Sequence, residues 1–322
     1  MMYYSEEEIE TICRKVKPRK GRDGLMVMGG KGEIADLLID KMPSADVFID
    51  VFGGGGSVTL AALRSGKYKR VVYNDVNPTL FNAMSLCKSG LVDDYKLEFY
   101  TKERYLATSD CVAKLCFSFN GKIENYGYNL NDQKLINAMH DVVYDSYYNS
   151  ADEVFPEIIE DIRFAEGLCK SREHFRCAVQ TIVSNYFGER GKFGANWKKG
   201  QCYLRLLHLE RFNRFKNTSS ELRSSKSVVS LMCENYTQTT TGLDDCNCVI
   251  YCDPPYKDKE GYIGFSKFDY DDFQDWMSEQ KHSVFLSESF DFQQYKVLWE
   301  GYNNGRIDYN STKRVERLYQ VR

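Results

Sequence analysis

The chain has 322 residues, of which 43% are hydrophobic and 28% are charged, with a formal net charge of −3. This is the composition of a globular protein and argues against a disordered chain. Its apolar runs fall well short of the roughly 20 residues of a membrane span, and the acidic start, MMYYSEEEIE, lacks the basic and apolar regions of a secretory signal. We therefore expect a cytoplasmic protein with no membrane partner.

Short glycine-containing turns separate the first predicted elements. Residues 5–20 are predicted to form a helix with a basic end. Turns are expected at residues 21–24 and 29–32, where glycines recur. Apolar residues at helical spacing predict a second helix over residues 33–41, which Pro43 ends.

A strand, a glycine turn, a helix and another strand then follow in direct succession. Residues 47–52 form a nearly continuous apolar run, which is typical of a buried strand. Glycines occupy positions 53–56, a helical pattern covers residues 57–64, and residues 68–75 form the next strand. This βαβ order predicts a parallel sheet.

The glycine turn has the features of a nucleotide-cofactor site. Glycines let the backbone approach a ligand closely, and the helix that follows offers unpaired N–H groups. Asp75 follows Gly56 by nineteen residues and ends the second strand, where an acid can meet the ribose hydroxyls of an adenosine cofactor. The alternative is a simple tight turn, with Asp75 capping the next helix. NAD, FAD and S-adenosylmethionine (SAM) all use this geometry, and the glycine spacing does not distinguish them.

The middle of the chain, about residues 95–226, shows little regular alternation of apolar and polar residues and is rich in Tyr, Phe, Asn, Lys and Arg. It is therefore predicted to be a separate, mostly helical lobe. Residues 162–226 contain fourteen Lys or Arg and five Asp or Glu, a net charge of +9. Residues 244–291 contain four Lys and twelve acids, a net charge of −8. The basic segment is either a solvated helical surface or a phosphate-binding surface, and charge alone does not decide between them.

Buried strands resume after this lobe, at residues 227–232, 249–252 and 283–287. The predicted fold is therefore α/β: one Rossmann-like sheet with a large, mostly helical insertion. The eleven cysteines of a chain with no export signal are expected to be free thiols. Cys246, Cys248 and Cys252 cluster, but no second cysteine pair or histidine set accompanies them, so we expect no metal site.

The strand at residues 249–252 runs directly into Asp253-Pro254-Pro255-Tyr256. In an open α/β sheet the ligand crevice lies at the carboxyl ends of the strands, so Asp253 is expected to point into it. The prolines have fixed φ angles and no N–H, which makes the turn rigid and leaves its carbonyls as acceptors. A carboxylate, a carbonyl and an aromatic ring together suit a flat group that bears an NH2, such as a purine. The alternative is a strand stopped by proline with an exposed tyrosine.

Several of these motifs resemble those of the Dam-like DNA adenine N6-methyltransferases, which include phage-borne members, and the resemblance runs along most of the chain. Residues 27–31, VMGGK, resemble the family's N-terminal motif, although Val27 stands where an aromatic residue is usual. Residues 52–56, FGGGG, match its SAM loop, and residues 72–75, VYND, resemble the strand whose last acid binds the SAM ribose. Residues 233–236, CENY, and 313–319, KRVERLY, resemble a strand end near the cofactor and the closing strand.

The resemblance implies a SAM-dependent methyltransferase that acts on the N6 amine of adenine in double-stranded DNA, with base flipping. Asp253 and the Pro254 carbonyl would hold the amine, Pro255 would keep the turn rigid, and Tyr256 would stack on the flipped adenine. The residues implied in cofactor binding are Gly30, Lys31, Phe52, Gly54, Gly56, Asp75 and Asp253.

The order of the motifs implies that residues 1–95 and 227–322 form the SAM-binding catalytic domain and residues 96–226 the target-recognition lobe. Within the lobe, residues 185–199 interleave aromatic and basic side chains, which favours contact with a nucleic-acid backbone and its bases. The candidate DNA-binding residues are Tyr186, Arg190, Lys192, Phe193, Lys198 and Lys199. Residues 117–126 are a second candidate segment.

Two alternatives stay open at this point. The same cradle for an amine could serve a methyltransferase that acts on RNA or on a protein glutamine amide, or the chain could be a non-catalytic DNA-binding relative. The DNA recognition sequence, the oligomeric state and any cognate restriction endonuclease do not follow from the residues. Restriction-modification, phage protection and regulation are equally compatible with them.

Overall fold

The structure is a computed structural model that describes residues 2–17, 23–190, 204–243, 245–255, 268–303 and 314–322. Its centre is a seven-stranded sheet in the order β5-β2-β1-β6-β7-β9-β8. The first five strands are parallel, and β9 and β8 are antiparallel to their neighbours. The strands are, in this spatial order, Val228–Met232, Tyr68–Asn74, Ala45–Asp50, Cys248–Cys252, Ser283–Glu288, Arg314–Gln320 and Lys296–Asn303.

The central strands are buried on both faces, as their apolar runs predict. Phe48 of β1 and Tyr251 of β6 belong to a core on one face, and Ile49 and Ile250 belong to a second core on the other. Successive side chains of a strand point to opposite faces, so a continuous apolar run supplies both cores. The α/β fold with a mostly parallel sheet is confirmed.

Helices cover both faces of the sheet. Helices α3 and α4 pack on the face that carries Phe48, and α12 packs on the other face through Phe273 and Met277. The helices nearest the sheet are α2 (Ala35–Lys41), α3 (Ser57–Ser65), α4 (Pro78–Ser89) and α12 (Tyr270–Glu279). None of the described helices combines the length and the apolar character that a membrane crossing demands.

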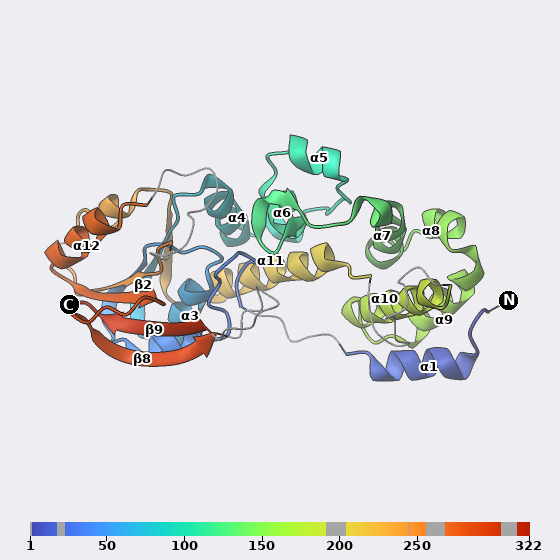
Figure 1. The fold of residues 1–322 in the computed structure, drawn as a ribbon, viewed down its shortest axis with the longest axis horizontal. Coiled ribbons are helices and arrows are strands. Elements are labelled where there is room, and N and C mark those ends of the chain that lie inside the picture. Colours follow the sequence, from blue (N-terminus) through green and yellow to red (C-terminus); the bar gives the residue numbers. More distant parts are fainter. Residues whose placement is uncertain (1, 18–22, 191–203, 244, 256–267, 304–313) are drawn as a thin grey trace.

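The other helices extend away from one end of the sheet region, as Figure 1 shows. They are α1 (Glu6–Lys15), α5 (Lys102–Ala107), α6 (Cys111–Cys116), α7 (Gln133–His140), α8 (Asn149–Val154), α9 (Ile159–Leu168), α10 (Arg172–Glu189) and α11 (Leu207–Ser224). A short hairpin of β3 (Ser118–Phe119) and β4 (Lys122–Tyr126) accompanies them. Its turn residues, Asn120 and Gly121, both have positive φ angles, as a tight two-residue hairpin requires.

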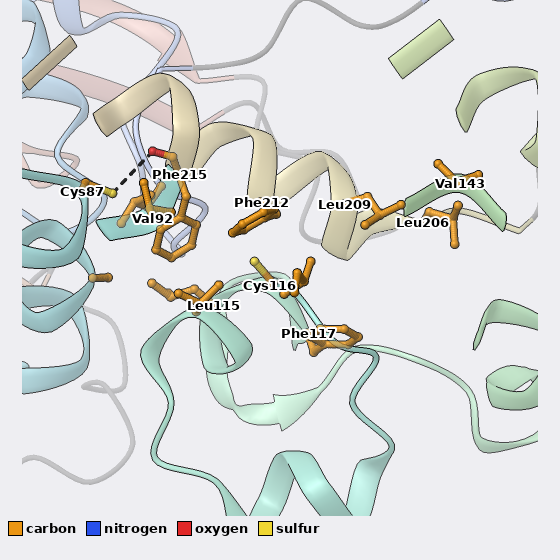
Figure 2. Close-up of a cluster of buried hydrophobic side chains, with 14 of the residues drawn as sticks. Cys87, Val92, Leu115, Cys116, Phe117, Val143, Leu206, Leu209, Phe212 and Phe215 are labelled. Carbon is orange, nitrogen blue, oxygen red and sulfur yellow. Dashed lines mark hydrogen bonds between the residues drawn. The ribbon is translucent and has the colours of Figure 1, made fainter. Parts of the chain in front are cut away.

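Helix α11 links the helical region to the sheet region. It packs on α4, α6 and α3 and extends toward the far helices (Figure 1). Phe212 and Phe215 project from α11 into a buried apolar layer with Leu115 and Cys116 (Figure 2). The Cys87 thiol of α4 donates a hydrogen bond to the Phe215 carbonyl over 3.5 Å. This layer fixes α11 against the helices that flank the sheet.

Arg64 of α3 adds a charged clamp at the same junction. Its guanidinium donates to Asp23 over 2.7 Å, to Asp36 over 2.8 Å and to Glu221 over 2.6 Å. The three carboxylates come from the N-terminal segment, from α2 and from α11. Because the arginine is one-third exposed, these ion pairs contribute little to stability. Their main effect is to orient the N-terminal segment, α2 and α11 relative to α3.

The N-terminal helix α1 packs against α9 and α10 and not against the sheet. Asp161 of α9 is fully buried and accepts hydrogen bonds from the backbone N–H groups of Tyr3, over 3.0 Å, and Tyr4, over 2.7 Å. Ser5 caps the helix that follows. The predicted division at residues 1–95, 96–226 and 227–322 remains a prediction, but residues 3–15 are in contact with helices of the predicted lobe.

We predict that Asp161→Ala lowers the free energy of unfolding by about 2–4 kcal/mol. The change leaves two backbone N–H groups at a buried site without their acceptor, and each such loss costs about 1–3 kcal/mol. Urea unfolding followed by circular dichroism measures the effect. The matched control is Glu160→Ala, which removes an exposed carboxylate of the same helix and should change stability by less than about 0.5 kcal/mol. Equal effects of the two variants would contradict the assigned role of Asp161.

Candidate active site

The carboxyl ends of the five parallel strands meet at one edge of the sheet. Strand β1 pairs with β2 on one side and with β6 on the other. The strand order therefore reverses direction beside β1, and ligands of open α/β sheets bind at such a switch point. Asp50, the last residue of β1, is in register with Tyr73 and Tyr251. The glycine turn, Asp75 and Asp253 accordingly emerge next to one another.

The glycine loop is shaped by close backbone contacts. Gly54 and Gly56 have φ angles of +50° and +77°, in the left-handed region that favours glycine. Gly53 lies against the ring of Tyr73, where a Cβ atom would come within 2.3 Å of a ring carbon. The Tyr73 hydroxyl donates to the Gly54 carbonyl over 2.8 Å. These contacts hold the loop open over the N-terminus of α3.

Asp75 is half-buried at the end of β2 and is bound to this loop. Its Oδ2 accepts from the Gly54 N–H and its Oδ1 from the Asn77 N–H, each over 2.8 Å. Burial raises the pKa of Asp75, and these two N–H groups oppose the rise. Each carboxylate oxygen keeps a further lone pair that a ligand hydroxyl can use.

A segment from the N-terminal region covers the loop. The Leu25 N–H donates to the Gly55 carbonyl over 2.7 Å, and the Ser57 hydroxyl donates to the Asp23 carbonyl over 2.8 Å. The segment continues through the exposed Gly30 to the buried Lys31. It thereby brings the lysine side chain to the end of β6.

Lys31 forms a buried ion pair with Asp253. Its ammonium lies 2.7 Å from both carboxylate oxygens and 3.6 Å from Glu316 Oε1 of β9, and the lysine and Glu316 side chains are only 4% and 5% exposed. Burial raises the pKa of Asp253 to about 6, Lys31 opposes this, and Glu316 and Glu288 add to it.

The turn after Asp253 is only partly described. Pro254 is buried and Pro255 is half-buried, and they follow Asp253, the first residue after β6. Tyr256, the predicted stacking residue, lies outside the described residues.

Phe52 joins an aromatic cluster beside the loop. Its ring centroid lies 5.5 Å from that of Phe273, 5.8 Å from that of Phe268 and 6.1 Å from that of Tyr236. Tyr236 belongs to the segment that follows β5, and Phe273 belongs to α12. The cluster forms an apolar wall at the carboxyl edge of the sheet.

The structure describes only two of the six predicted DNA-binding residues, Tyr186 and Arg190. Tyr186 is 2% exposed and packs edge-on against Tyr3 with ring centroids 5.2 Å apart, so it is a packing residue and not an open stacking platform. Arg190 is exposed at the end of α10 and lies 4.2 Å from the Tyr186 ring centroid. Lys192, Phe193, Lys198 and Lys199 lie outside the part of the chain that the structure describes.

Comparison with known proteins identifies the family. Residues 28–321 match the profile of the D12 class N6 adenine-specific DNA methyltransferases. The chain belongs to this family. It is an adenine-specific DNA methyltransferase, and DNA is its substrate.

Relatives of the methyltransferase cover most of its length. The DNA adenine methylase of Escherichia coli K12 is 22% identical over 87% of this chain and 80% of its own. The type II methyltransferase M.MjaIII of Methanocaldococcus jannaschii is 21% identical over 91% and 95%. The DNA N-6-adenine-methyltransferase of Escherichia phage P1 is 25% identical over 98% of this chain and 35% of its own. Among solved structures, the rRNA methyltransferase aviRa of Streptomyces viridochromogenes aligns with 100% of this chain and 97% of its own length. The two share 8% sequence identity, with a TM-score of 0.34.

Three polar residues of the methyltransferase site were not among the predicted ones. Asp50 is buried beneath the glycine loop and accepts from the Thr59 hydroxyl over 2.7 Å. The Asn74 amide donates to the carbonyls of Val51 and Glu234 and so joins three strand ends. Glu316 faces Lys31. The signal for Asp50 and Asn74 was a polar residue at the end of an apolar strand, and Glu316 had no comparable signal.

We predict that Gly53→Ala destabilises this methyltransferase by about 2–3 kcal/mol, because the new methyl group would overlap the buried Tyr73 ring. Gly66→Ala is the control. Gly66, unlike Gly53, adopts a left-handed φ angle, +65°, but nothing lies within 4 Å of its added Cβ atom, so its cost should stay near 1 kcal/mol. Urea midpoints of both variants decide the question. A Gly53 variant as stable as the Gly66 variant would mean that the loop is not packed as described.

We also predict that Asp50→Asn flattens the dependence of stability on pH. Burial raises the pKa of Asp50 to about 7, the Thr59 hydroxyl opposes this, and Asp253 and Asp75 add to it. A raised pKa stabilises the fold below the unfolded value, roughly pH 4, and this contribution is lost as pH rises to about 7. Asparagine still accepts from Thr59 and does not titrate in this range.

Between pH 5 and pH 7 the wild type should therefore lose stability relative to Asp50→Asn, at up to about 1.4 kcal/mol per pH unit. Urea unfolding at pH 5, 6, 7 and 8 measures both proteins. Asp46→Asn is the control on the same strand, because Asp46 is exposed and its hydrogen bond from Lys69 lowers its pKa. Parallel curves for the wild type and Asp50→Asn would contradict the assignment.

Proposed function

We propose that the methyl donor is SAM, that the glycine loop and Asp75 hold it, and that Asp253 presents the adenine amine to it. The observation that carries this proposal is the register of β1 with β6, which sets Asp253 beside the start of the glycine loop. A donor on the loop and an amine on the carboxylate would then be neighbours. Proximity of this kind lowers the barrier to a direct transfer.

The chain's own residues fit an adenosine-type donor. The loop leaves no room for side chains at Gly53 and Gly55, and the N–H groups at the start of α3 face the same edge. Asp75 offers acceptor lone pairs for ribose hydroxyls, and Phe52 contributes an apolar wall. When bound, SAM would supply an activated methyl group on a positively charged sulfur.

Asp253 would accept a hydrogen bond from the N6 amine, and the carbonyl of Pro254 would accept the other. The nitrogen lone pair of adenine is delocalised into the ring, and two acceptors on its hydrogens favour a pyramidal, more nucleophilic nitrogen. Positive charge develops on that nitrogen during methyl transfer, and a carboxylate already in place stabilises it. Tyr256 is proposed to stack on the flipped base.

Lys31 occupies both oxygens of Asp253 before the amine arrives. Each of these oxygens keeps a second lone pair, so the amine can bind to one of them while the lysine stays in place. Glu316 lies close enough to the ammonium to neutralise part of its charge. We therefore assign Lys31 the role of holding the Asp253 carboxylate in position for the amine.

Residues 96–226 are proposed to bind double-stranded DNA. Arg190 is exposed at the end of α10, in the basic block that the sequence marks out. The β3–β4 hairpin is a second contact, because Phe119 at its tip is 53% exposed and Arg211 holds its base by donating to the Cys116 and Ser118 carbonyls. An exposed aromatic ring on an anchored turn suits a contact between bases.

The decisive experiment incubates the protein with methyl-labelled SAM and mixed-sequence duplex DNA and measures N6-methyladenine by mass spectrometry. Wild-type protein should label DNA, and Asp253→Asn should label it at least about 100-fold more slowly while still binding DNA. Asp245→Asn, an exposed carboxylate just before β6, is the control and should match the wild type. Label in RNA or protein but not in DNA would overturn the substrate, and full activity of Asp253→Asn would overturn the mechanism.

A further inference from the structure

Three thiols gather where α1 meets α9 and α10, outside the active site. Cys13 lies in the last turn of α1, Cys169 follows the end of α9, and Cys177 lies in α10. The sulfurs of Cys13 and Cys169 are 3.9 Å apart, and both cysteines are in the thiol form. A disulfide bond measures about 2.05 Å, so the two sulfurs must approach each other by about 1.9 Å to be joined.

The scaffold holds this pair in place from both ends of α1. The His174 imidazole of α10 lies 2.7 Å from the Cys13 carbonyl and caps the last turn of the helix. At the other end, Asp161 binds the N–H groups of Tyr3 and Tyr4. The two sulfurs face each other because two independent contacts dock α1, and not because of their own attraction.

The hydrogen bond between the thiols makes them chemically unequal. It lowers the pKa of Cys13, which accepts the bond, and it raises the pKa of Cys169, which donates it. Cys13 is 5% exposed, whereas Cys169 is only half-buried. A small oxidant can therefore reach Cys169, and the Cys13 sulfur, 3.9 Å away, is close enough to attack the mixed disulfide that results.

We propose that Cys13 and Cys169 form a reversible disulfide that locks α1 to α9 when a low-molecular-weight disulfide is present. In the first step Cys169 exchanges with that disulfide, forming a mixed disulfide and releasing one small thiol. In the second step the Cys13 sulfur attacks Sγ of Cys169, the protein disulfide forms and the second small thiol leaves. The protein loses two protons and two electrons, and the small disulfide gains both.

The lock matters because of where the chain leads after α1. The helix ends at Lys15, and the chain reaches Asp23 beside the glycine loop within eight residues. A bond between Cys13 and Cys169 would convert the docking of α1 into a further covalent connection between the far helices and the cofactor loop. It would also close a loop that includes β1 and β2, which restricts the unfolded chain.

The test uses the full-length protein, incubated with oxidised glutathione, blocked with N-ethylmaleimide and digested without reduction. We expect a linked peptide pair that contains Cys13 and Cys169, and a rise in Tm of about 5 °C that dithiothreitol reverses. Because Cys169 must lose its proton before the first exchange, linkage should be roughly 15- to 30-fold faster at pH 8.5 than at pH 7.

Cys13→Ser and Cys169→Ser should abolish both the linked peptide and the rise in Tm, whereas Cys177→Ser and Cys246→Ser should keep both. The Tm of each reduced variant is compared with that of the reduced wild type, and peptide mapping of the wild type does not depend on any variant folding. A Cys169–Cys177 link, glutathione retained on Cys169 without closure, or a rise in Tm that survives in Cys169→Ser would each overturn the proposal.

Discussion

The register between β1 and β6 is the constraint on which the active site depends. Both strands are buried on both faces, and a slip of one residue would move every side chain into the wrong core. The pairing of Asp50 with Tyr251 is therefore strongly specified by packing. The position of Asp253 beside the glycine loop follows from it without any direct bond between the two. The proposed catalytic carboxylate thus obtains its position from the core beneath it.

The site concentrates negative charge around a single described cation. Asp50, Asp75 and Asp253 all have raised pKa values because of burial, and Glu316 and Glu288 lie close enough to raise that of Asp253 further. Such a cluster is costly in an empty pocket, and Lys31 offsets part of the cost. A donor that carries a positive charge, and an amine that becomes positive during transfer, would both stabilise it. The electrostatics of the site therefore favour the proposed reaction over a simple binding function.

Val27 connects the β3–β4 hairpin with the glycine loop. A Cβ atom added at Gly55 would lie 3.2 Å from the Val27 side chain, and one at Gly121 would lie 2.7 Å from the Val27 backbone. The segment that carries Lys31 is thus held between the glycine loop and the turn of the β3–β4 hairpin. A displacement of the hairpin by DNA would first move this segment, because the turn of the hairpin lies against the Val27 backbone. The proposed DNA contact at the hairpin and the Lys31–Asp253 pair therefore have a short physical path between them.

What could be predicted from the sequence depends on how far apart along the chain the contacting residues lie. The strand, glycine turn and helix around residues 47–64 were predictable because their patterns are local, and Asp253 was predictable because it directly follows a buried strand. The docking of α1 was not predictable, because it depends on Asp161, far along the chain. Glu316 was missed for the same reason, since its partner Lys31 lies at the other end of the sequence.

Tyr186 illustrates the point most sharply. An aromatic residue among basic ones has the same pattern whether its ring meets a base or another ring. Here Tyr3, whose backbone N–H donates to Asp161, packs against its ring. Arg190 then covers the ring from outside, so a residue chosen for its charge also has a packing role. The surface that meets DNA must therefore be built from exposed side chains that this packed layer supports, and the docking of α1 contributes to that support.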